Sequence, residues 1–457
     1  MAGLTRQLAE FVSGLAFEKL PQTAVETAKR GAIDTVGVMF AGRDEPVAKL
    51  AAELAAAAAG GEARLAFDRG FAHSQDAALA NGTAAHALDY DDVALEGHPS
   101  VVLVPAILAE GERLSASGRD LIAAYVAGYE TWGELLDRDE DQHHGKGWHP
   151  TAVFGTVAAA AAAARLARLD PARTSNALGI AASMAGGLVA NFGSMTKPFQ
   201  AGRAAQSGIL AARLAGRGMT ASPDALEHPS GFLRAFSPAG RVRVDGELAA
   251  GRDWHIVRQG LNVKRYPVCY ALHRAIDGML AIRSRRTVAA EQVAEIEVSL
   301  GRTQMVPLRE HRPRGALEAK FSAEFAMASA LVAGRVGMGE LSNEFVNQAA
   351  VQALIPKVRV TPVDEADPED PLFAPFDRVR VKLNDGSMLE GEAVRYALGH
   401  ARNPIGLDEL HAKFRDCVGA ALSPDASARL FERLSQLEAQ PAVATLYEIP
   451  PVKGVAK

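Results

Sequence analysis

The chain has 457 residues, of which 48% are hydrophobic, and this is enough for two domains with a large buried core. It carries 49 basic and 54 acidic residues and no long run of one sign, so the net charge of −5 argues against nucleic acid as a principal partner. Its two cysteines, Cys269 and Cys417, exclude a disulfide framework and an iron–sulfur cluster held by several cysteine ligands.

No segment resembles a membrane span. The most apolar one, AVFGTVAAAAAAARLARLD, is dominated by alanine, which favours helix strongly but enters lipid weakly. The N-terminus has charges inside its apolar stretch and no small-residue cleavage pattern, so it is not expected to be a signal peptide. With so few cysteines, these features predict a cytoplasmic protein.

The pattern up to about residue 255 is almost entirely helical, with no convincing strand alternation. One helix is predicted to begin after Pro21 and to end at Gly42, because apolar residues recur between them at helical spacing. Small residues dominate the other predicted helices, which indicates close helix–helix packing. These helices are expected within residues 76–92, 101–118, 118–137 and 174–193.

The pattern of apolar and polar residues changes in the region 260–396. VAEIEVSLG and PKVRVTPV alternate as strands do, and FDRVRVKLNDGSMLEGEAV predicts a hairpin that turns at Asn384-Asp385-Gly386. Helical patterns lie between these strands and return in the C-terminal part. We therefore expect a mainly α protein with an α+β part. Its predicted domains are a discontinuous helical domain, 1–259 with 397–457, and an inserted α+β lid domain, 260–396.

Four segments place polar or charged groups beside glycine and proline in apolar surroundings. They are LDYDDVALEGHPS at 88–100, GKGWHPTAVFGT at 145–156, NFGSMTKPFQAGRAAQSG at 191–208 and NVKRYPVCYALHRAID at 262–277. Lysine and arginine side chains in them can bind carboxylates, while aspartate and histidine side chains can move protons. Together they predict the removal of a proton α to a carboxylate and stabilisation of the charge that develops.

Simpler interpretations remain open for these residues. Asp91, Asp92 and Glu96 can face water at a helix end, and His149 can be a helix cap or a core histidine. Lys197 can lie on the surface, and Cys269 can be a small buried hydrophobic residue.

A metal site is the sharper alternative for the segment 88–100. However, Asp89, Asp91, Asp92 and His98 lack the alternating register of a calcium loop and the spacing of a zinc site. We therefore expect no metal and no other cofactor.

In order and spacing, the motifs NGTAAHALDYDD, GHPS, GWHPTAVFGT, GSMTKPFQAGRAA, KRYPVCYALH and EAKFSAEFA resemble the MmgE/PrpD family. Its members include 2-methylcitrate dehydratases, cis-aconitate decarboxylases and iminodisuccinate epimerases. The resemblance implies a metal-independent enzyme for small di- or tricarboxylates, with the fold outlined above. It also implies a homodimer. No membrane or nucleic-acid partner is expected, given the charge balance and the lack of a membrane-type segment.

The motifs also assign candidate residues. Asp89, His98, His149, Lys197 and Lys264 match the family's DxDD, HPS, GxHP, TKP and KxxP elements. Cys269 is a further catalytic candidate because a thiol can reprotonate a carbanion. The candidate substrate-binding residues are Arg203, Arg265, Tyr266 and His273.

Three positions depart from the cis-aconitate decarboxylase pattern. Val93, Cys269 and Phe325 stand where those enzymes have threonine, histidine and tyrosine, so that activity is not expected here. The combination of PxCYAxH, GHPS and KFSxE is closer to the iminodisuccinate epimerases.

We therefore expect a hydro-lyase, in which His149 or Asp89 takes the α-proton, Lys197 and Lys264 bind carboxylates, and His98 protonates the leaving hydroxyl. An epimerase that uses His149 and Cys269 is the alternative. An inactive carboxylate-binding homologue is the third hypothesis.

Overall fold

The computed structural model describes residues 3–56, 60–65 and 70–447. The protein is 55% helical and 9% strand, which confirms the prediction of a mainly α fold with an α+β part. It divides into two compact units, one formed by Met1–Val263 together with Gly406–Lys457 and the other by Lys264–Ile405. None of the helices in the described ranges is both long and apolar enough to cross a membrane.

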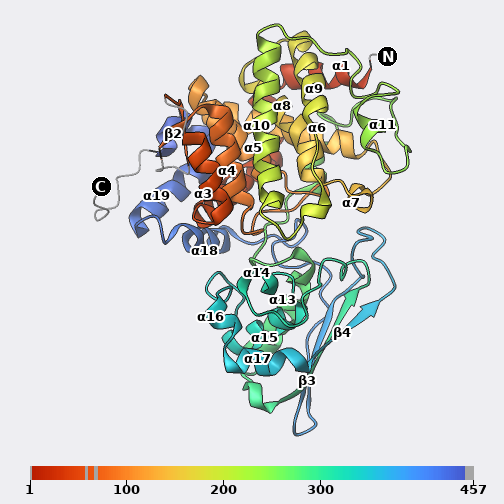
Figure 1. Ribbon diagram of the computed structural model, residues 1–457, viewed down its shortest axis with the longest axis vertical. Helices are drawn as coiled ribbons and strands as arrows, with labels where there is room; N and C mark the ends of the chain where they lie inside the picture. The colour runs from red at the N-terminus through yellow and green to blue at the C-terminus, as the bar shows by residue number, and fades with distance from the viewer. Residues whose placement is uncertain (1–2, 57–59, 66–69, 448–457) are drawn as a thin grey trace. The chain divides into compact units, whose positions relative to one another are not determined.

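The first unit is a helical bundle built from both parts of the chain (Figure 1). Its main helices are α1 (Leu4–Gly14), α2 (Gln22–Gly42), α3 (Pro46–Ala56), α4 (Ser74–His86), α5 (Ser100–Leu114), α6 (Gly118–Leu136), α8 (Pro150–Leu166), α9 (Pro171–Met184), α10 (Thr196–Gly216), α18 (Leu407–Val418) and α19 (Pro424–Ser435). Short helices are α7 (His143–Lys146), α11 (Phe232–Phe236) and α12 (His255–Gln259), and 3-10 turns are η1 (Phe17–Lys19), η2 (Val189–Asn191), η6 (Leu437–Ala439) and η7 (Val443–Tyr447).

Helix α2 follows the predicted bounds closely. Pro21 is its N-cap residue, and its last residue is Gly42. A Cβ atom at Gly42 would lie 2.1 Å from the carbonyl oxygen of Ala84 in α4, so only glycine allows the two helices to approach here.

Helix α8 lies at the centre of the bundle, where its alanine side chains allow close packing by its neighbours. Its seven consecutive alanines, residues 158–164, are at most 1% exposed, and α8 packs against α5, α6, α9 and α10. Figure 1 shows these helices side by side. A Cβ atom at Gly208 of α10 would lie 2.4 Å from that of Ala159, so small residues set the close spacing of the two backbones.

Helices α4 and α10 also cross closely, and this crossing places two functional segments together. A Cβ atom at Gly82 of α4 would lie 2.8 Å from the Cα of Gly202 in α10. His86 ends α4 about one turn beyond Gly82, and Lys197 stands in the first turn of α10. The glycine pair therefore brings the end of one helix near the start of the other.

One sequence prediction for this unit was wrong. Two short strands occur before residue 255, β1 (Ala63–Arg64) and β2 (Phe71–Ala72), which pair antiparallel. Two residues are too few to produce a recognisable alternation of apolar and polar positions.

The second unit packs helices against a four-stranded sheet. The strands are β3 (Val293–Gly301), β4 (Val358–Val363), β5 (Arg378–Leu383) and β6 (Met388–Glu390). Their order is β4-β3-β5-β6, with β3 parallel to β4 and antiparallel to β5. The helices are α13 (His273–Arg285), α14 (Ala316–Ala319), α15 (Ala323–Ala333), α16 (Asn343–Val346) and α17 (Ala349–Leu354), with 3-10 turns η3 (Tyr270–Leu272), η4 (Ala290–Gln292) and η5 (Ile355–Lys357).

The predicted hairpin is confirmed. β5 and β6 pair antiparallel, and the turn between them contains Gly386 at φ 85°, a conformation that glycine adopts without strain. Alternate residues of β5 are buried, and helices α13 and α15 share a hydrophobic core with β3 and β5.

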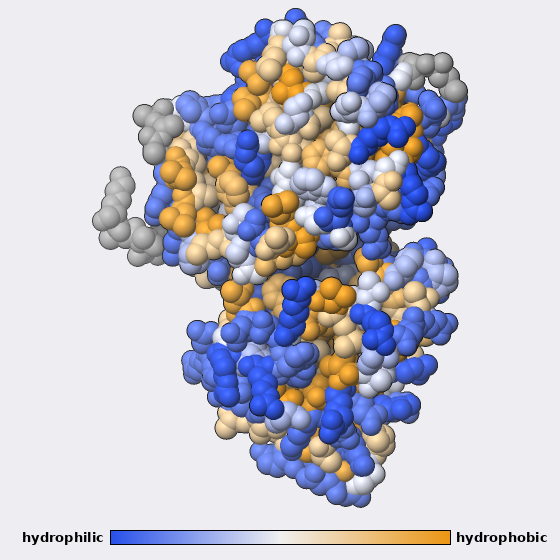
Figure 2. All heavy atoms as spheres, turned by 45° about the vertical axis from the view of Figure 1, so that its right-hand side comes forward, coloured by the Kyte–Doolittle hydropathy of each residue, from blue (hydrophilic) through white to orange (hydrophobic). Residues whose placement is uncertain are grey.

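Hydrophilic and hydrophobic residues are interspersed on the face of the molecule shown in Figure 2.

Candidate active site

A short loop, residues 87–98, joins α4 to α5 and carries most of the LDYDDVALEGHPS motif. Three of its residues that are not glycine, Asp89, Leu95 and Glu96, have positive φ angles of 53°, 51° and 55°. Such a conformation costs a side-chain-bearing residue about 1–2 kcal/mol. The loop therefore needs contacts from elsewhere to hold this shape.

Several contacts supply that support. Val93 and Asn262 exchange two backbone hydrogen bonds of 2.9 and 3.0 Å. The indole nitrogen of Trp132 donates to the carbonyl of Leu95 at 3.1 Å. Gly97 lies against the same indole, where a Cβ atom would come within 2.8 Å of the ring.

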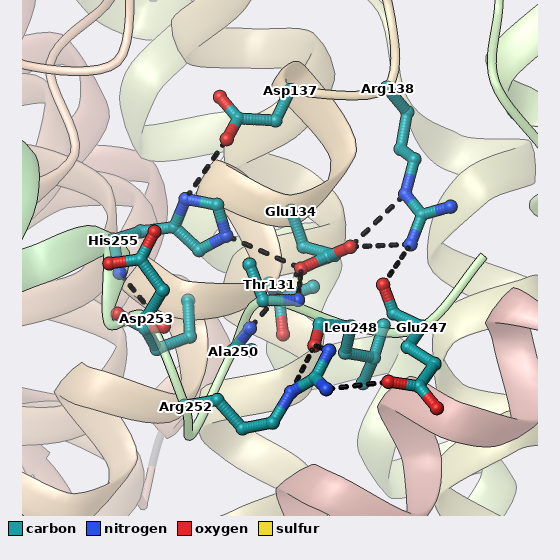
Figure 3. A network of polar contacts seen from close by, with 12 residues as sticks. Thr131, Glu134, Asp137, Arg138, Glu247, Leu248, Ala250, Arg252, Asp253 and His255 are labelled. Carbon is teal, nitrogen blue, oxygen red and sulfur yellow. Dashed lines mark hydrogen bonds and ion pairs between the residues drawn. The ribbon is translucent and has the colours of Figure 1, made fainter.

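The segment that carries Asn262 is itself anchored to α6 by a buried network (Figure 3). Glu134 accepts hydrogen bonds from Arg138 at 2.6 Å and from the backbone N–H of Ala249 at 2.9 Å, and it lies 3.3 Å from Nε2 of His255. Burial would raise the pKa of Glu134, but His255 and Arg138 lower it to about 2. The carboxylate of Glu134 is therefore charged, and its contacts hold the segment from Ala249 to His255, which leads to Asn262.

Asp91 lies between two imidazole rings. Its Oδ1 is 2.9 Å from Nδ1 of His86, and its Oδ2 is 2.7 Å from Nδ1 of His98. Burial would raise the pKa of Asp91, but the two histidines hold it well below its usual range. Burial lowers the pKa of His86 to about 4. The carboxylate therefore stays ionised and can support a positive charge on His98.

The structure excludes the water-facing interpretation for two of the three acidic residues concerned. Asp91 and Asp92 are both 0% exposed, whereas Glu96 is partly exposed. Buried carboxylates need partners. For Asp91 these partners are the two histidines described above.

Lys197 and Asp89 form the second pair of the site. Nζ of Lys197 donates a hydrogen bond of 2.6 Å to Oδ1 of Asp89, and Nε2 of His98 lies 3.9 Å from the same oxygen. The ammonium also lies 5.2 Å from the ring centroid of Phe192. Asp89 thus stands between a lysine and a histidine, each at the distance of an ion pair.

His149 is the N-cap residue of α8 and is buried. Its Nδ1 lies 2.6 Å from Oε1 of Gln200, whose amide nitrogen donates to the carbonyl of Leu188 at 3.2 Å. Because the amide nitrogen is engaged elsewhere, Oε1 must accept from Nδ1–H of His149, and Nε2 is left as the unprotonated nitrogen. Burial, reinforced by the charges of His86 and Lys197, holds the pKa of His149 well below its usual range.

Ring contacts bring these groups into one cluster. The ring centroids of His86 and His98 are 4.5 Å apart, and those of His86 and His149 are 6.1 Å apart. Phe192 meets His149 edge-on at 4.9 Å. Chemically, the cluster combines a neutral imidazole, a second imidazole backed by a carboxylate, and an ammonium group.

The geometry alone would also admit a cation. One ligand atom each from His86, Asp89, Asp91 and His98 lies within 4.8 Å of the others. However, the ammonium of Lys197 already forms an ion pair with Asp89. A metal ion would have to displace that ammonium, so the donor set fits a proton-transfer network better than a metal centre.

Arg203 makes other contacts. It lies on α10, where its guanidinium donates to Gln206 and Ser207 of the same helix at 3.2 and 2.5 Å. These bonds connect Arg203 to the surface of its own helix, whereas hydrogen bonds and ring contacts join Lys197, Asp89, His98 and His149.

The second unit holds the remaining candidates near the start of α13. Lys264 is buried, and Tyr266 donates a hydrogen bond of 2.5 Å to Asp277. Arg265 lies 4.0 Å from the same carboxylate, and the ring of His273 meets that of Tyr266 at 5.1 Å. Tyr266, Arg265 and His273 thus form a group around Asp277.

Cys269 and Phe325 also lie in this unit. Cys269 is a partly buried cysteine just before η3, and its backbone N–H donates to the carbonyl of Lys320 at 2.9 Å. Phe325 is fully buried in the core and meets Phe345 edge-on.

Sequence reasoning did not single out His86, Gln200 or Phe192 as functional. His86 lies within the NGTAAHALDYDD motif, but no role was assigned to it. Gln200 follows Lys197 by three positions, almost one helical turn, and this spacing is the one signal that could have placed it near the site. Nothing in the sequence marks Phe192.

Comparison with known proteins covers almost the whole chain. Residues 6–245 match the model of the MmgE/PrpD N-terminal domain, and residues 266–438 match that of the C-terminal domain. A cis-aconitate decarboxylase of Mus musculus is 27% identical, with 100% of this chain and 96% of the relative aligned. The enzymes of that name from Homo sapiens and Aspergillus terreus are 28% and 26% identical, over 96% and 92% of this chain and 92% and 90% of their own lengths.

Proposed function

The chain belongs to the MmgE/PrpD family, and we propose that it is a lyase that removes a proton α to a carboxylate of a small di- or tricarboxylate. Within that class we propose a hydro-lyase, which eliminates water from a hydroxy acid without a metal ion. The full-length relatives named cis-aconitate decarboxylases support a lyase acting on such acids. The cluster around His149 supports the chemistry.

The observation that carries the proposal is the arrangement of His149 and Gln200. With Nδ1–H donated to Gln200 at 2.6 Å, Nε2 holds the lone pair, and the lowered pKa keeps the ring neutral near pH 7. A neutral, oriented imidazole is the form that a general base requires, and such a base contributes about 10²–10⁴-fold to the rate.

Lys197 supplies the positive charge for the acid's carboxylate. Removal of the α-proton places negative charge on that carboxylate, and a nearby ammonium stabilises it. Oδ1 of Asp89 lies 2.6 Å from Nζ of Lys197 and orients the ammonium. We propose that Lys264, which matches the lysine of the family's KxxP element, binds another carboxylate of the substrate. Arg203, Arg265, Tyr266 and His273 are further proposed substrate-binding residues.

His98 is the proposed acid. Asp91 lies 2.7 Å from its Nδ1 and stabilises the protonated ring. His98 gives its proton to the departing hydroxyl while His149 receives the α-proton, so the products are an alkene and one water molecule. In this step His98 loses one proton and His149 gains one, so the proton count balances.

The relatives' names favour a second reaction, decarboxylation, in which the electron pair comes from a breaking carbon–carbon bond. Val93, Cys269 and Phe325 argue against it, because they supply no hydroxyl or imidazole where the decarboxylase pattern has them. Phe325 is fully buried among core residues of the second unit. An epimerase that uses His149 and Cys269 as two bases is the other alternative.

The test is incubation with a panel of hydroxy and unsaturated di- and tricarboxylic acids in deuterated water, followed by ultraviolet absorbance and proton NMR. A hydro-lyase forms an alkene from a hydroxy acid without releasing carbon dioxide. Release of carbon dioxide would indicate a decarboxylase, and deuterium incorporation without alkene would indicate an epimerase. Either result would overturn the hydro-lyase proposal.

The family resemblance also leads us to propose a homodimer, and the low cysteine content leads us to propose a cytoplasmic location. Analytical ultracentrifugation would reveal the dimer as a species of twice the 48.2 kDa chain mass.

A further inference from the structure

A buried lysine from the C-terminal part of the chain reaches the 87–98 loop. Nζ of Lys413, on α18, donates a hydrogen bond of 2.8 Å to the backbone carbonyl of Tyr90 and lies 4.1 Å from the centroid of its ring. The same ammonium is 2.5 Å from Oδ1 of Asp34 on α2. All three residues are buried.

This arrangement places charges where water cannot screen them. Asp34, in the middle of α2, is 2% exposed and Lys413 is 8% exposed. Burial raises the pKa of Asp34, while Lys413 and the backbone N–H of Asp92 oppose that rise. Burial and the charge of Asp34 raise the pKa of Asp92 well above its usual range, whereas Asp34 is the carboxylate that pairs directly with Lys413.

The contact with Tyr90 falls between two residues of the candidate active site. Tyr90 stands between Asp89, which pairs with Lys197, and Asp91, which pairs with His86 and His98. A hydrogen bond to the carbonyl of Tyr90 fixes the peptide plane that leads into Asp91. It also holds the chain beside Asp89, whose left-handed backbone would otherwise relax.

We propose that Lys413 and Asp34 are positioning residues, which hold the 87–98 loop so that Asp89 and Asp91 meet their partners. The effect on catalysis rests on the proposed function, whereas the effect on the loop does not. Neither residue belongs to a motif that identified the site, and Lys413 lies 323 residues from Tyr90. The packing of α18 against α2 brings them together.

Lys29 provides a matched control. It also lies on α2 and also joins that helix to the C-terminal segment, through Glu438 at 3.1 Å, with Glu26 at 3.0 Å. Its contacts do not include the 87–98 loop. A change at Lys29 therefore removes ion pairs between α2 and more exposed partners, one of them in the C-terminal segment, without removing a bond to the loop.

The experiment compares Lys413→Met, the charge-neutral double variant Asp34→Asn/Lys413→Met, and Lys29→Met in the full-length protein. Hydrogen exchange followed by mass spectrometry reports on peptides that cover 87–98, and steady-state kinetics report on turnover. For both Lys413 variants we expect exchange in 87–98 to rise at least about tenfold, with other peptides of the first unit unchanged. We expect kcat to fall by about 10–100-fold with KM little changed, since loss of alignment acts on the reacting state.

Lys29→Met is expected to match the wild type in both measurements. Unchanged exchange in 87–98 in the Lys413 variants would overturn the proposal. So would loss of protection along the whole chain in both of them, because the pair would then support the fold as a whole. If the wild type turned over no carboxylate, the proposed function would fail, but the exchange measurement would still decide the positioning role.

Discussion

Lys197 and Asp89 form an ion pair with Nζ 2.6 Å from Oδ1, although they lie 108 residues apart on α10 and on the 87–98 loop. Asp89 reaches this position from a left-handed backbone conformation, φ 53°. The pair holds the ammonium in a defined place before substrate binds. A carboxylate of the substrate can then bind an ammonium group whose position is already fixed. This lowers the free energy needed to reorganise the site during the reaction.

Replacement of Lys197 by alanine should abolish activity. The change removes the charge proposed to bind the substrate carboxylate and leaves Asp89 without its ion-pair partner. We expect kcat/KM to fall by about 10³-fold, comparable to the loss of one strong electrostatic donor. Steady-state kinetics measure this, with Lys49→Ala as control, because Lys49 is half-exposed and lies on α3. Wild-type rates for Lys197→Ala would remove the anion-binding role.

A carboxylate in place of Gln200 should move the pH profile. The wild-type acid limb of kcat/KM is expected well below the pH at which a free imidazole titrates, because burial holds the pKa of His149 well below its ordinary value of 6.5 and the base must be unprotonated. In Gln200→Glu, a negative charge beside Nδ1 stabilises the imidazolium and raises the pKa of His149. The acid limb should shift to higher pH, and an unshifted limb would argue against His149 as the base.

The pH dependence of stability should reveal the burial of His86. Its pKa is about 4 in the folded protein and 6.5 in the unfolded chain, so the unfolded chain binds more protons between these values. The free energy of unfolding should therefore fall as the pH drops from 6.5 to 4, by up to about 1.4 kcal/mol per pH unit for this residue. Urea unfolding at several pH values should show a weaker dependence in His86→Gln than in the wild type. An equal pH dependence of the free energy of unfolding in the two proteins would contradict this prediction.

A chelator should leave activity unchanged. His86, Asp89, Asp91 and His98 lie close enough to hold a cation, but Lys197 pairs with Asp89. Dialysis against EDTA, followed by an assay with and without added divalent metals, measures this. Loss of activity that one metal ion restores would show that the cluster binds metal and that Lys197 moves aside.

The fold was largely predictable because its elements carry strong local signals. Helix α2 ends at a glycine, β3 alternates over nine residues, and the hairpin turns at Asn-Asp-Gly. The strands β1 and β2 escaped prediction because two residues leave no periodicity. Candidate residues such as His98 and His149 stood out because they sit beside proline at helix starts.

The supporting residues were much harder to predict, because sequence charge does not reveal burial. Asp91 and Asp92 resemble a solvated helix end until the structure places His86, His98 and Asp34 around them. Lys413 resembles a surface lysine of the amphipathic helix α18, and its contact with Tyr90 depends on a packing of distant segments. Such partners are long-range in sequence and have no motif of their own.

In the proposed reaction, His149 removes the α-proton of a carboxylic acid substrate. The most direct measurement is the rate of alkene formation by His149→Gln, with binding of the same hydroxy acid followed by calorimetry. We predict a loss of about 10²–10⁴-fold in kcat, the usual contribution of a general base, with binding retained. A His149→Gln enzyme that forms alkene at the wild-type rate would contradict the claim.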